Sequence, residues 1–395
     1  MTGSLLQLQD LPPARATAAL DLVEFMLGEG LQATDANDVL SGMSQRIRAA
    51  GVPLDRATSI VPLLHAEATA SARFWERDKG VRSFTFPYSP VSGAQYARSP
   101  AAVVHETREW LILWLPDVAP DAYDIVDDLK ADGFVHYIMA PVFMKSGMAA
   151  TFSFATRDPD GFSALDIAFL RAAFPALSAC QEILTTHRAM HEVMRMYVGE
   201  EPHRRILKGD VHRGEVVHVR SALLFADMRR FTELTADMSA TEATALLNTY
   251  YDCVVPPVEA EGGEVLKFMG DGILAMFRDT GAAADTCAQA LRAASAGLAS
   301  VAAHDGTPPF DVGVALHFGE AAYGNVGSGI RLDYTVIGRD VNLAARVAGL
   351  CGTLNEPLLA SAAFHAHLTG ADSRSVGLHT LKGLPAPQEV FALGR

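Results

Sequence analysis

Hydrophobic and polar positions alternate with different periods along the chain, and each period predicts a different element. From about residue 15 to 70, apolar residues recur at the spacing of a helix. Glycine or proline interrupts this pattern at Gly28, Gly30, Gly51 and Pro53. We therefore expect several short helices in this first region.

A strand-like pattern comes next. The segments 81–86, 136–143 and 149–154 are rich in β-branched and aromatic residues and are bounded by Gly, Pro or Asp, which favours strands. Residues 145–147 are typical of a hairpin turn between the last two segments. From 163 to 184, apolar residues return to helical spacing after a serine cap. The first half of the chain is thus expected to end in a sheet followed by a long helix.

The end of this helix and the residues after it predict a join between two domains. Five positions fit the a/d spacing of a coiled coil: Ile183, Thr186, Met190, Val193 and Tyr197. Because the pattern covers only about two heptads, a coiled coil between two chains and a single surface helix both remain open. Breakers follow at Gly199, Pro202, Gly209 and Gly214. We expect a helical linker over 186–215 and a second domain from residue 216.

Two aspartates follow strand patterns in the second half. Residues 221–226 are almost wholly apolar, which predicts a strand buried on both faces that ends at Asp227. The segments 264–269 and 273–277 predict a hairpin with Asp271 between two glycines at its tip. Carboxylates at strand ends suit a hard divalent cation that also binds substrate phosphates. The pattern predicts a site for Mg²⁺ or Mn²⁺.

A lysine interrupts the first strand of this hairpin. Strict alternation would place Lys267 on the same face as Val265 and Met269, where an ammonium group without a partner is disfavoured. The side chain is therefore expected to find a hydrogen-bond acceptor. The alternative is a lysine on an edge strand whose ammonium group reaches solvent.

The last third predicts more strands and a helix with polar groups on one face. Residues 311–328 favour two strands, and a further strand leads to a helix that begins after Gly338 with Asp340 as its cap. Asn342 and Arg346 are four residues apart on this helix, so both can reach one anion such as a phosphate. An Asn near a helix end and a solvated Arg are the alternative.

Composition narrows the class of protein. The chain has 395 residues, which at roughly 150 residues per domain allows two or three domains. Its 49% hydrophobic and 20% charged residues are typical of a folded protein, and its net charge of −14 disfavours nucleic acid as a partner. Four separated cysteines fit a reducing compartment. Without a long apolar run or a basic, apolar leader, we expect a cytoplasmic protein with no membrane span.

The first half resembles a known type of sensor domain. The stretch MAPVFMKSGMAATFSFATRDPDGFSALDIAFLRAAFPALSACQEIL is similar to the second half of a GAF-type ligand-binding domain. The resemblance implies a regulatory domain over 1–185 that responds to an unknown small molecule or protein. A dimerising α+β domain without a ligand remains the alternative.

The second half resembles a catalytic family. The segments FADMRRFTEL, LKFMGDGILAMF and DYTVIGRDVNLAARV, in this order and spacing, resemble the catalytic domain of class III nucleotidyl cyclases. The resemblance covers 216–395 and implies a ferredoxin-like domain that acts as a homodimer with two composite active sites. The expected fold class is thus α+β, with a GAF-like domain, a linker helix and a ferredoxin-like cyclase domain.

The resemblance also implies roles for single residues. Asp227 and Asp271, with the Met228 carbonyl, match the positions that bind two Mg²⁺ or Mn²⁺ ions per site. Asn342 and Arg346 match the pair that stabilises the transition state. The residues matching substrate contacts are Lys267 and Thr335 for the purine and Lys382, in HTLKGLPAPQEVFAL, for the terminal phosphates.

Two residues bear on the choice of nucleotide, and two others depart from the pattern of the family. Guanylate-selective members of the family carry an acidic residue and a Cys or Ser at the positions of Lys267 and Thr335, so these residues favour ATP and resemble the class IIIb subgroup. Arg230 replaces a usual glycine, and Glu320 stands where some relatives have an arginine. An adenylate cyclase is expected. The alternatives are a guanylate cyclase or a catalytically idle nucleotide-binding dimer.

Overall fold

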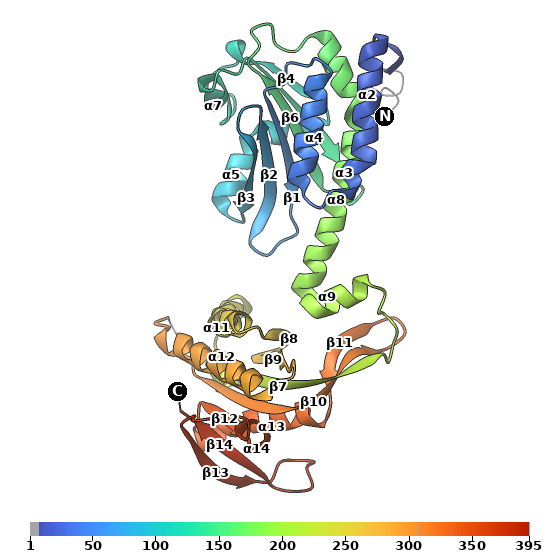
Figure 1. Cartoon of the computed structure of the whole chain (residues 1–395). Helices are drawn as coiled ribbons and strands as arrows, with labels where there is room; N and C mark the ends of the chain where they lie inside the picture. The colour runs from blue at the N-terminus through green and yellow to red at the C-terminus, as the bar shows by residue number, and fades with distance from the viewer. Residues whose placement is uncertain (1–7, 307, 395) are drawn as a thin grey trace. The chain divides into compact units, whose positions relative to one another are not determined.

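The computed structural model describes residues 8–306 and 308–394, which form two compact units divided in sequence between Val193 and Met194 (Figure 1). Each unit combines an antiparallel or mixed sheet with helices, so the expected α+β fold class is confirmed.

The first unit is built on a six-stranded antiparallel sheet with the order β3-β2-β1-β6-β5-β4. The expected strands at 81–86, 136–143 and 149–154 are confirmed. The strands of this sheet are β1 (Arg56–Pro62), β2 (Ala68–Glu76), β3 (Gly80–Pro87), β4 (Leu111–Trp114), β5 (His136–Phe143) and β6 (Ala149–Thr156).

Helices cover both faces of this sheet. One face packs against α2, α4 and α8 through a core that includes Leu22, Met43 and Phe169. The other face packs against shorter helices through Val104 and Leu129. The helices of this unit are α2 (Pro13–Leu27), α3 (Glu29–Gln32), α4 (Ala36–Ala49), α5 (Pro90–Ala97), α6 (Pro100–Thr107), η1 (Leu115–Asp117), α7 (Val126–Ala131) and α8 (Ala164–Val198).

The expectation of helices up to residue 70 is wrong after α4. Residues 56–62 form the strand β1, which pairs with β2 on one side and with β6 on the other. In such a strand, successive side chains point to opposite faces of the sheet. Short apolar runs do not distinguish a buried strand from a buried helix by spacing alone, which explains the error.

The long helix α8 begins at Ala164, after Ser163, whose hydroxyl accepts the Asp166 N–H as expected of a cap. By length and composition it is the one helix among the described residues that could span a membrane. Phe169, Leu170 and Leu177 of this helix are instead buried in the core of the first unit.

The second unit has an eight-stranded sheet with the order β13-β14-β12-β10-β7-β9-β8, and β11 pairs with β10 outside this path. The succession β7-α11-β8-β9-α12-β10 with the order β10-β7-β9-β8 is a ferredoxin-like arrangement, as expected. The strands are β7 (Val216–Met228), β8 (Glu264–Met269), β9 (Gly272–Arg278), β10 (Val312–Gly327), β11 (Leu332–Ile337), β12 (Leu358–Ser361), β13 (Ser373–His379) and β14 (Gln388–Leu393).

The helices of the second unit divide between the two faces of its sheet. The face that carries Leu224 and Ile273 packs against α11 and α12, while the face that carries Leu223 and Leu274 packs against β11 and α13. The helices are α9 (Glu200–Leu207), α10 (Phe231–Leu234), α11 (Ala240–Ala260), α12 (Ala283–Ala303), α13 (Arg339–Leu354) and α14 (Ala362–His365).

One sequence expectation for this unit is wrong. Residues 312–327 form the single long strand β10 because β7 pairs with them along most of their length, through Gly319 and beyond. The breaker-rich join contains the helix α9, in which Pro202 occupies the first turn, where a proline costs no hydrogen bond. The predicted linker over 186–215 stays a prediction.

Candidate active site

Two aspartates meet where β7 ends and where the β8–β9 hairpin turns. Asp227 pairs with Gly272 across β7 and β9, and the Met228 N–H donates to the Asp271 carbonyl at 3.4 Å. Gly270 has φ +66°, a conformation that favours glycine and allows the tight turn that presents Asp271. The fold therefore brings Asp227, Met228 and Asp271 together.

The electrostatics of this carboxylate pair favour a cation. Although Asp227 reaches solvent, partial burial, the negative charge of Asp271 and a hydrogen bond between the two carboxyl groups raise the pKa of Asp227 to about 6. Ionised carboxylates are acceptors only, so a divalent cation would relieve their mutual repulsion. Among residues 8–306 and 308–394, no cluster of three or more His, Cys, Asp or Glu side chains forms a complete metal site. The pair fits a metal whose remaining ligands are carbonyl, water or substrate oxygens.

A β-bulge changes the face on which Lys267 lies. Val265 pairs with Ala275, but Lys267 pairs with Leu274, so the register of β8 shifts at Leu266. Because paired residues share a face, Lys267 lies on the Leu274 face with Met269, opposite to Val265. The expectation that Lys267 shares a face with Val265 is wrong, since strict alternation does not hold through a bulge.

The ammonium group of Lys267 has the acceptor that its position requires. It forms an ion pair with the Asp333 carboxylate on β11. Thr335, two residues after Asp333, lies on the same face of β11 and pairs with Gly324 of β10. The structure thus brings Lys267 to the strand that carries Thr335.

The helix α13 presents two more candidate residues. Asn342 is exposed and Arg346 is half-buried, one turn apart on α13. The guanidinium of Arg346 lies close to Gly383, since a Cβ atom on Gly383 would be 3.5 Å from its nitrogens. Arg346 therefore lies beside the loop that carries the exposed Lys382.

The predicted role of Asp340 as a helix cap is wrong. The N-cap of α13 is Gly338, without a side-chain hydrogen bond. The Asp340 carboxylate instead accepts the Glu320 N–H of β10 at 2.8 Å, which ties the first turn of α13 to the sheet. This contact depends on Gly319, where a Cβ atom would be 2.2 Å from an Asp340 oxygen.

These residues form three separate groups in one chain. The groups are the Asp227–Met228–Asp271 cluster, Lys267 with the strand of Thr335, and Arg346 with the Lys382 loop. Within the described parts of the chain, no hydrogen bond or ion pair joins one group to another.

The structure shows the surroundings of Arg230 and Glu320, the two residues that depart from the pattern of the family. Arg230 adopts φ +55° at the start of α10, the left-handed conformation in which a glycine carries no strain. Glu320 binds His218 Nδ1 at 2.7 Å on the neighbouring strand β7.

Arg229 forms a clamp on the end of α13. Its guanidinium donates to the carbonyls of Cys351 and Glu356 and to Asn355 Oδ1 at 3.1 Å. The Arg229 N–H donates to the Asp311 carbonyl at 2.8 Å. This arginine fixes the C-terminal end of α13 beside the metal-binding candidates, a role that no local sequence pattern signals.

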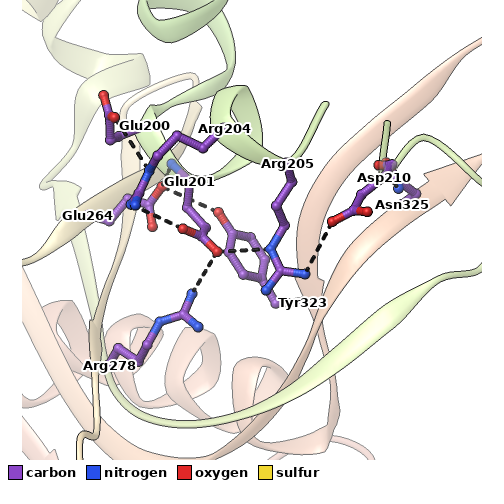
Figure 2. Close-up of polar contacts among 9 residues, drawn as sticks. All are labelled: Glu200, Glu201, Arg204, Arg205, Asp210, Glu264, Arg278, Tyr323 and Asn325. Carbon is purple, nitrogen blue, oxygen red and sulfur yellow. Dashed lines mark hydrogen bonds and ion pairs between the residues drawn. The ribbon is translucent and has the colours of Figure 1, made fainter. Parts of the chain in front are cut away.

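A second network, which no local sequence pattern indicates, attaches α9 to the sheet. Figure 2 shows the Glu201 carboxylate between Arg205, at 2.8 Å, and Arg278, at 3.8 Å. The Glu201 N–H donates to Glu264 Oε1 at 3.1 Å, so a side chain of β8 caps this helix, whose own N-cap is a glycine. The Asn325 amide donates to the Asp210 carbonyl after α9. Glu264 thus links α9 to the strand that carries Lys267.

The fold and the carboxylate pair define an α+β unit with a candidate metal-dependent site. Residues 217–383 match the model of the adenylate and guanylate cyclase catalytic domain. The C-terminal unit therefore belongs to the family of class III cyclase catalytic domains, as the sequence motifs indicate.

Several known proteins are similar to this part of the chain. An adenylate cyclase of Anabaena cylindrica is 35% identical over 136 residues, which are 33% of this chain and 27% of the relative. Adenylate cyclase 1 of Rhizobium meliloti is 31% identical over 175 residues, 42% of this chain and 26% of the relative. The crystal structure of the adenylyl cyclase CyaB from P. aeruginosa is 27% identical with a TM-score of 0.41, over 46% of this chain and 96% of that one. The matches span about a quarter of the length of these two curated relatives.

Proposed function

We propose that the protein is an adenylate cyclase that converts ATP to 3′,5′-cyclic AMP and pyrophosphate in composite sites of a homodimer. The observation that carries this proposal is the Asp227–Asp271 carboxylate pair within a cyclase catalytic domain. The match to the cyclase catalytic domain supports a homodimer, because the resemblance to this family implies composite sites. The N-terminal unit is proposed to be a GAF-like regulatory domain of a cytoplasmic protein.

The proposed reaction forms one bond and breaks one. The ribose 3′-oxygen attacks the α-phosphorus, loses its proton, and displaces pyrophosphate by cleavage of the bond between the α-phosphorus and its bridging oxygen. Asp227, Asp271 and the Met228 carbonyl would hold two Mg²⁺ or Mn²⁺ ions. When bound, such ions favour ionisation of the attacking hydroxyl and neutralise the departing phosphates.

Asn342 and Arg346 are proposed to act on the α-phosphoryl group. Negative charge increases there as the new bond forms, and a guanidinium with an amide donor stabilises that charge more in the transition state than in bound ATP. The proximity of Arg346 to Gly383 supports a common phosphate site with Lys382. Lys382 would contact the terminal phosphates.

Lys267 and Thr335 are proposed to select adenine. The ammonium group donates to adenine N1, and the threonine hydroxyl accepts from the exocyclic amine, whereas guanine presents the opposite donor and acceptor at these atoms. The ion pair of Lys267 with Asp333, on the strand of Thr335, supports this pairing of the two strands. A guanylate cyclase is the alternative, since the family includes both activities.

The proposal is tested by the products of the purified full-length protein. ATP or GTP is supplied with Mg²⁺ or Mn²⁺, and cyclic nucleotides are separated from pyrophosphate. Cyclic AMP from ATP, absent with Asp271→Asn and retained with the exposed control Asp285→Asn, is the expected result. Cyclic GMP as the main product would contradict the proposed selection of adenine and favour a guanylate cyclase. Nucleotide binding without any cyclic product would favour the idle signalling dimer.

A further inference from the structure

A pocket lies in the first unit, between the sheet and the helices α4 and α8. Its apolar lining includes Met26, Leu40, Met43, Val61 and Phe152. Its polar lining comes from both the sheet and α8, as Ser59, Arg73, Gln181, Thr185, Arg188 and Glu192. None of these residues belongs to the proposed catalytic machinery.

The floor of the pocket is a row of three side chains across the sheet. Ser59 of β1 pairs with Arg73 of β2 on one side and with Phe152 of β6 on the other. Cross-strand partners present their side chains to the same face, so all three point towards the helices. An arginine in such a row sits on the face that forms the hydrophobic core.

Arg73 is a half-buried cation on this floor. Within residues 8–306 and 308–394 its guanidinium has no hydrogen bond and no ion pair. Burial and the nearby charge of Arg188 lower the pKa of Arg73, while Asp35 and Glu192 oppose this change. A guanidinium so placed is costly unless a hydrogen-bonding anion joins it.

The neighbouring charges already have partners. Arg188 Nε donates to Glu192 Oε1 at 2.7 Å, one turn apart on α8. Asp35 caps α4 by accepting the Asn37 N–H at 2.8 Å. Arg188 and Glu192 pair with each other, so within the described residues Arg73 is the charged group of the pocket lining that has no ion pair.

Beside Arg73, a short chain of hydrogen bonds ends at a hydroxyl group. Ser59 Oγ donates to Gln181 Oε1 at 3.0 Å, and Gln181 Nε2 donates to Thr185 Oγ1 at 3.1 Å. The Thr185 oxygen thus acts as an acceptor in this chain, and its own proton has no acceptor among the described side chains. Thr185 can therefore donate to a ligand in the pocket.

We propose that this pocket binds a small aliphatic monocarboxylate, with its carboxylate on Arg73 and Thr185 and its chain between Met26, Leu40 and Met43. A planar guanidinium matches the two oxygens of a carboxylate. Methionine and leucine side chains adapt to a flexible alkyl chain. The pocket residues from Gln181 to Glu192 lie on α8, so the ligand would contact the helix that continues beyond Val193.

Calorimetric titration of the full chain with octanoate tests this site. Octanol serves as the uncharged probe of the same length, and octyl phosphate tests the alternative anion. We expect octanoate to bind at least about tenfold more tightly than octanol, because a charge-assisted hydrogen bond contributes about 1.5–3 kcal/mol. Stronger binding of octyl phosphate would overturn the choice of a carboxylate, and equal binding of octanoate and octanol would overturn the role of Arg73.

Variants distinguish the loss of a ligand contact from a general loss of stability. Arg73→Met should weaken octanoate binding about tenfold and leave octanol unchanged, while Arg77→Met, just after β2, should leave both unchanged. Thr185→Val keeps the volume of the side chain and should weaken octanoate severalfold. Melting temperatures confirm that each variant is folded. Unaltered octanoate binding in folded Arg73→Met, or no octanoate binding by the unmodified chain, contradicts the proposal.

Discussion

Lys267 on β8 forms an ion pair with Asp333 on β11, two residues before Thr335. The pair joins the hairpin that carries Asp271 to the strand that carries the second proposed adenine contact. Both side chains are partly exposed, so the pair contributes little to stability and more to the direction in which the ammonium group points.

Asp333→Asn should raise the KM for ATP and leave kcat nearly unchanged. The carboxylate orients Lys267, and an exposed ion pair contributes at most about 1 kcal/mol, which corresponds to roughly a fivefold change. Steady-state kinetics with ATP measure the effect. Asp285→Asn is the matched control, and an unchanged KM in Asp333→Asn would show that the ion pair does not position the lysine.

Asp271→Asn should stabilise the metal-free protein and remove its response to Mg²⁺. The substitution eliminates the like charge beside Asp227, whose cost is seen in the raised pKa of Asp227. Melting temperatures are compared with and without Mg²⁺ at pH 8, which lies above the raised pKa of Asp227. A variant that Mg²⁺ stabilises as strongly as the unmodified protein would place the metal elsewhere.

Acid should destabilise the first unit through Glu76. Burial would raise the pKa of Glu76, but the hydrogen bond from Lys79 and the charges of Lys79, Arg56 and Arg82 lower it below its ordinary value. A lowered carboxyl pKa stabilises the fold above the unfolded-state pKa, about 4.5, and this contribution is lost as the pH falls through the folded-state pKa.

Glu76→Gln should therefore destabilise the unit at pH 7 by about 1–3 kcal/mol and by less at low pH. Urea unfolding at several pH values measures the difference between the two proteins. A difference that does not shrink on acidification would contradict the role of the Glu76 charge.

Glu264→Ala should loosen α9 from the sheet. The carboxylate caps the Glu201 N–H of a helix whose N-cap is Gly199, so its loss should cost about 0.5–2 kcal/mol. The urea midpoint of the second unit is the measurement. Glu264→Gln retains an acceptor oxygen and should lose less, and Glu259→Ala, exposed on α11, should have no effect.

The hairpin that carries Asp271 could be predicted from the sequence because all of its signals are local. Two short runs rich in apolar residues mark β8 and β9, and glycines flank the aspartate at the turn. The bulge at Leu266 could not be predicted, since it depends on the register with β9. The face of Lys267 was therefore predicted incorrectly from an otherwise correct strand.

Contacts between segments that are distant in the sequence could not be predicted. Asp340 looks like a cap in the sequence, but β10 brings the Glu320 N–H to its carboxylate. The row of Arg73, Ser59 and Phe152 arises only when β1 lies between β2 and β6. The residue pattern of a single segment does not indicate which strands will lie beside it in the sheet.

The central claim is that two chains complete each catalytic site, and complementation between inactive variants tests it most directly. Lys267→Met and Asp271→Asn should each be inactive with ATP and Mg²⁺. After the two are mixed and allowed to exchange subunits, about half of the dimers hold one intact site, so cyclic AMP formation should recover to about a quarter of the unmodified rate. No recovery in mixtures shown to contain heterodimers would contradict composite sites.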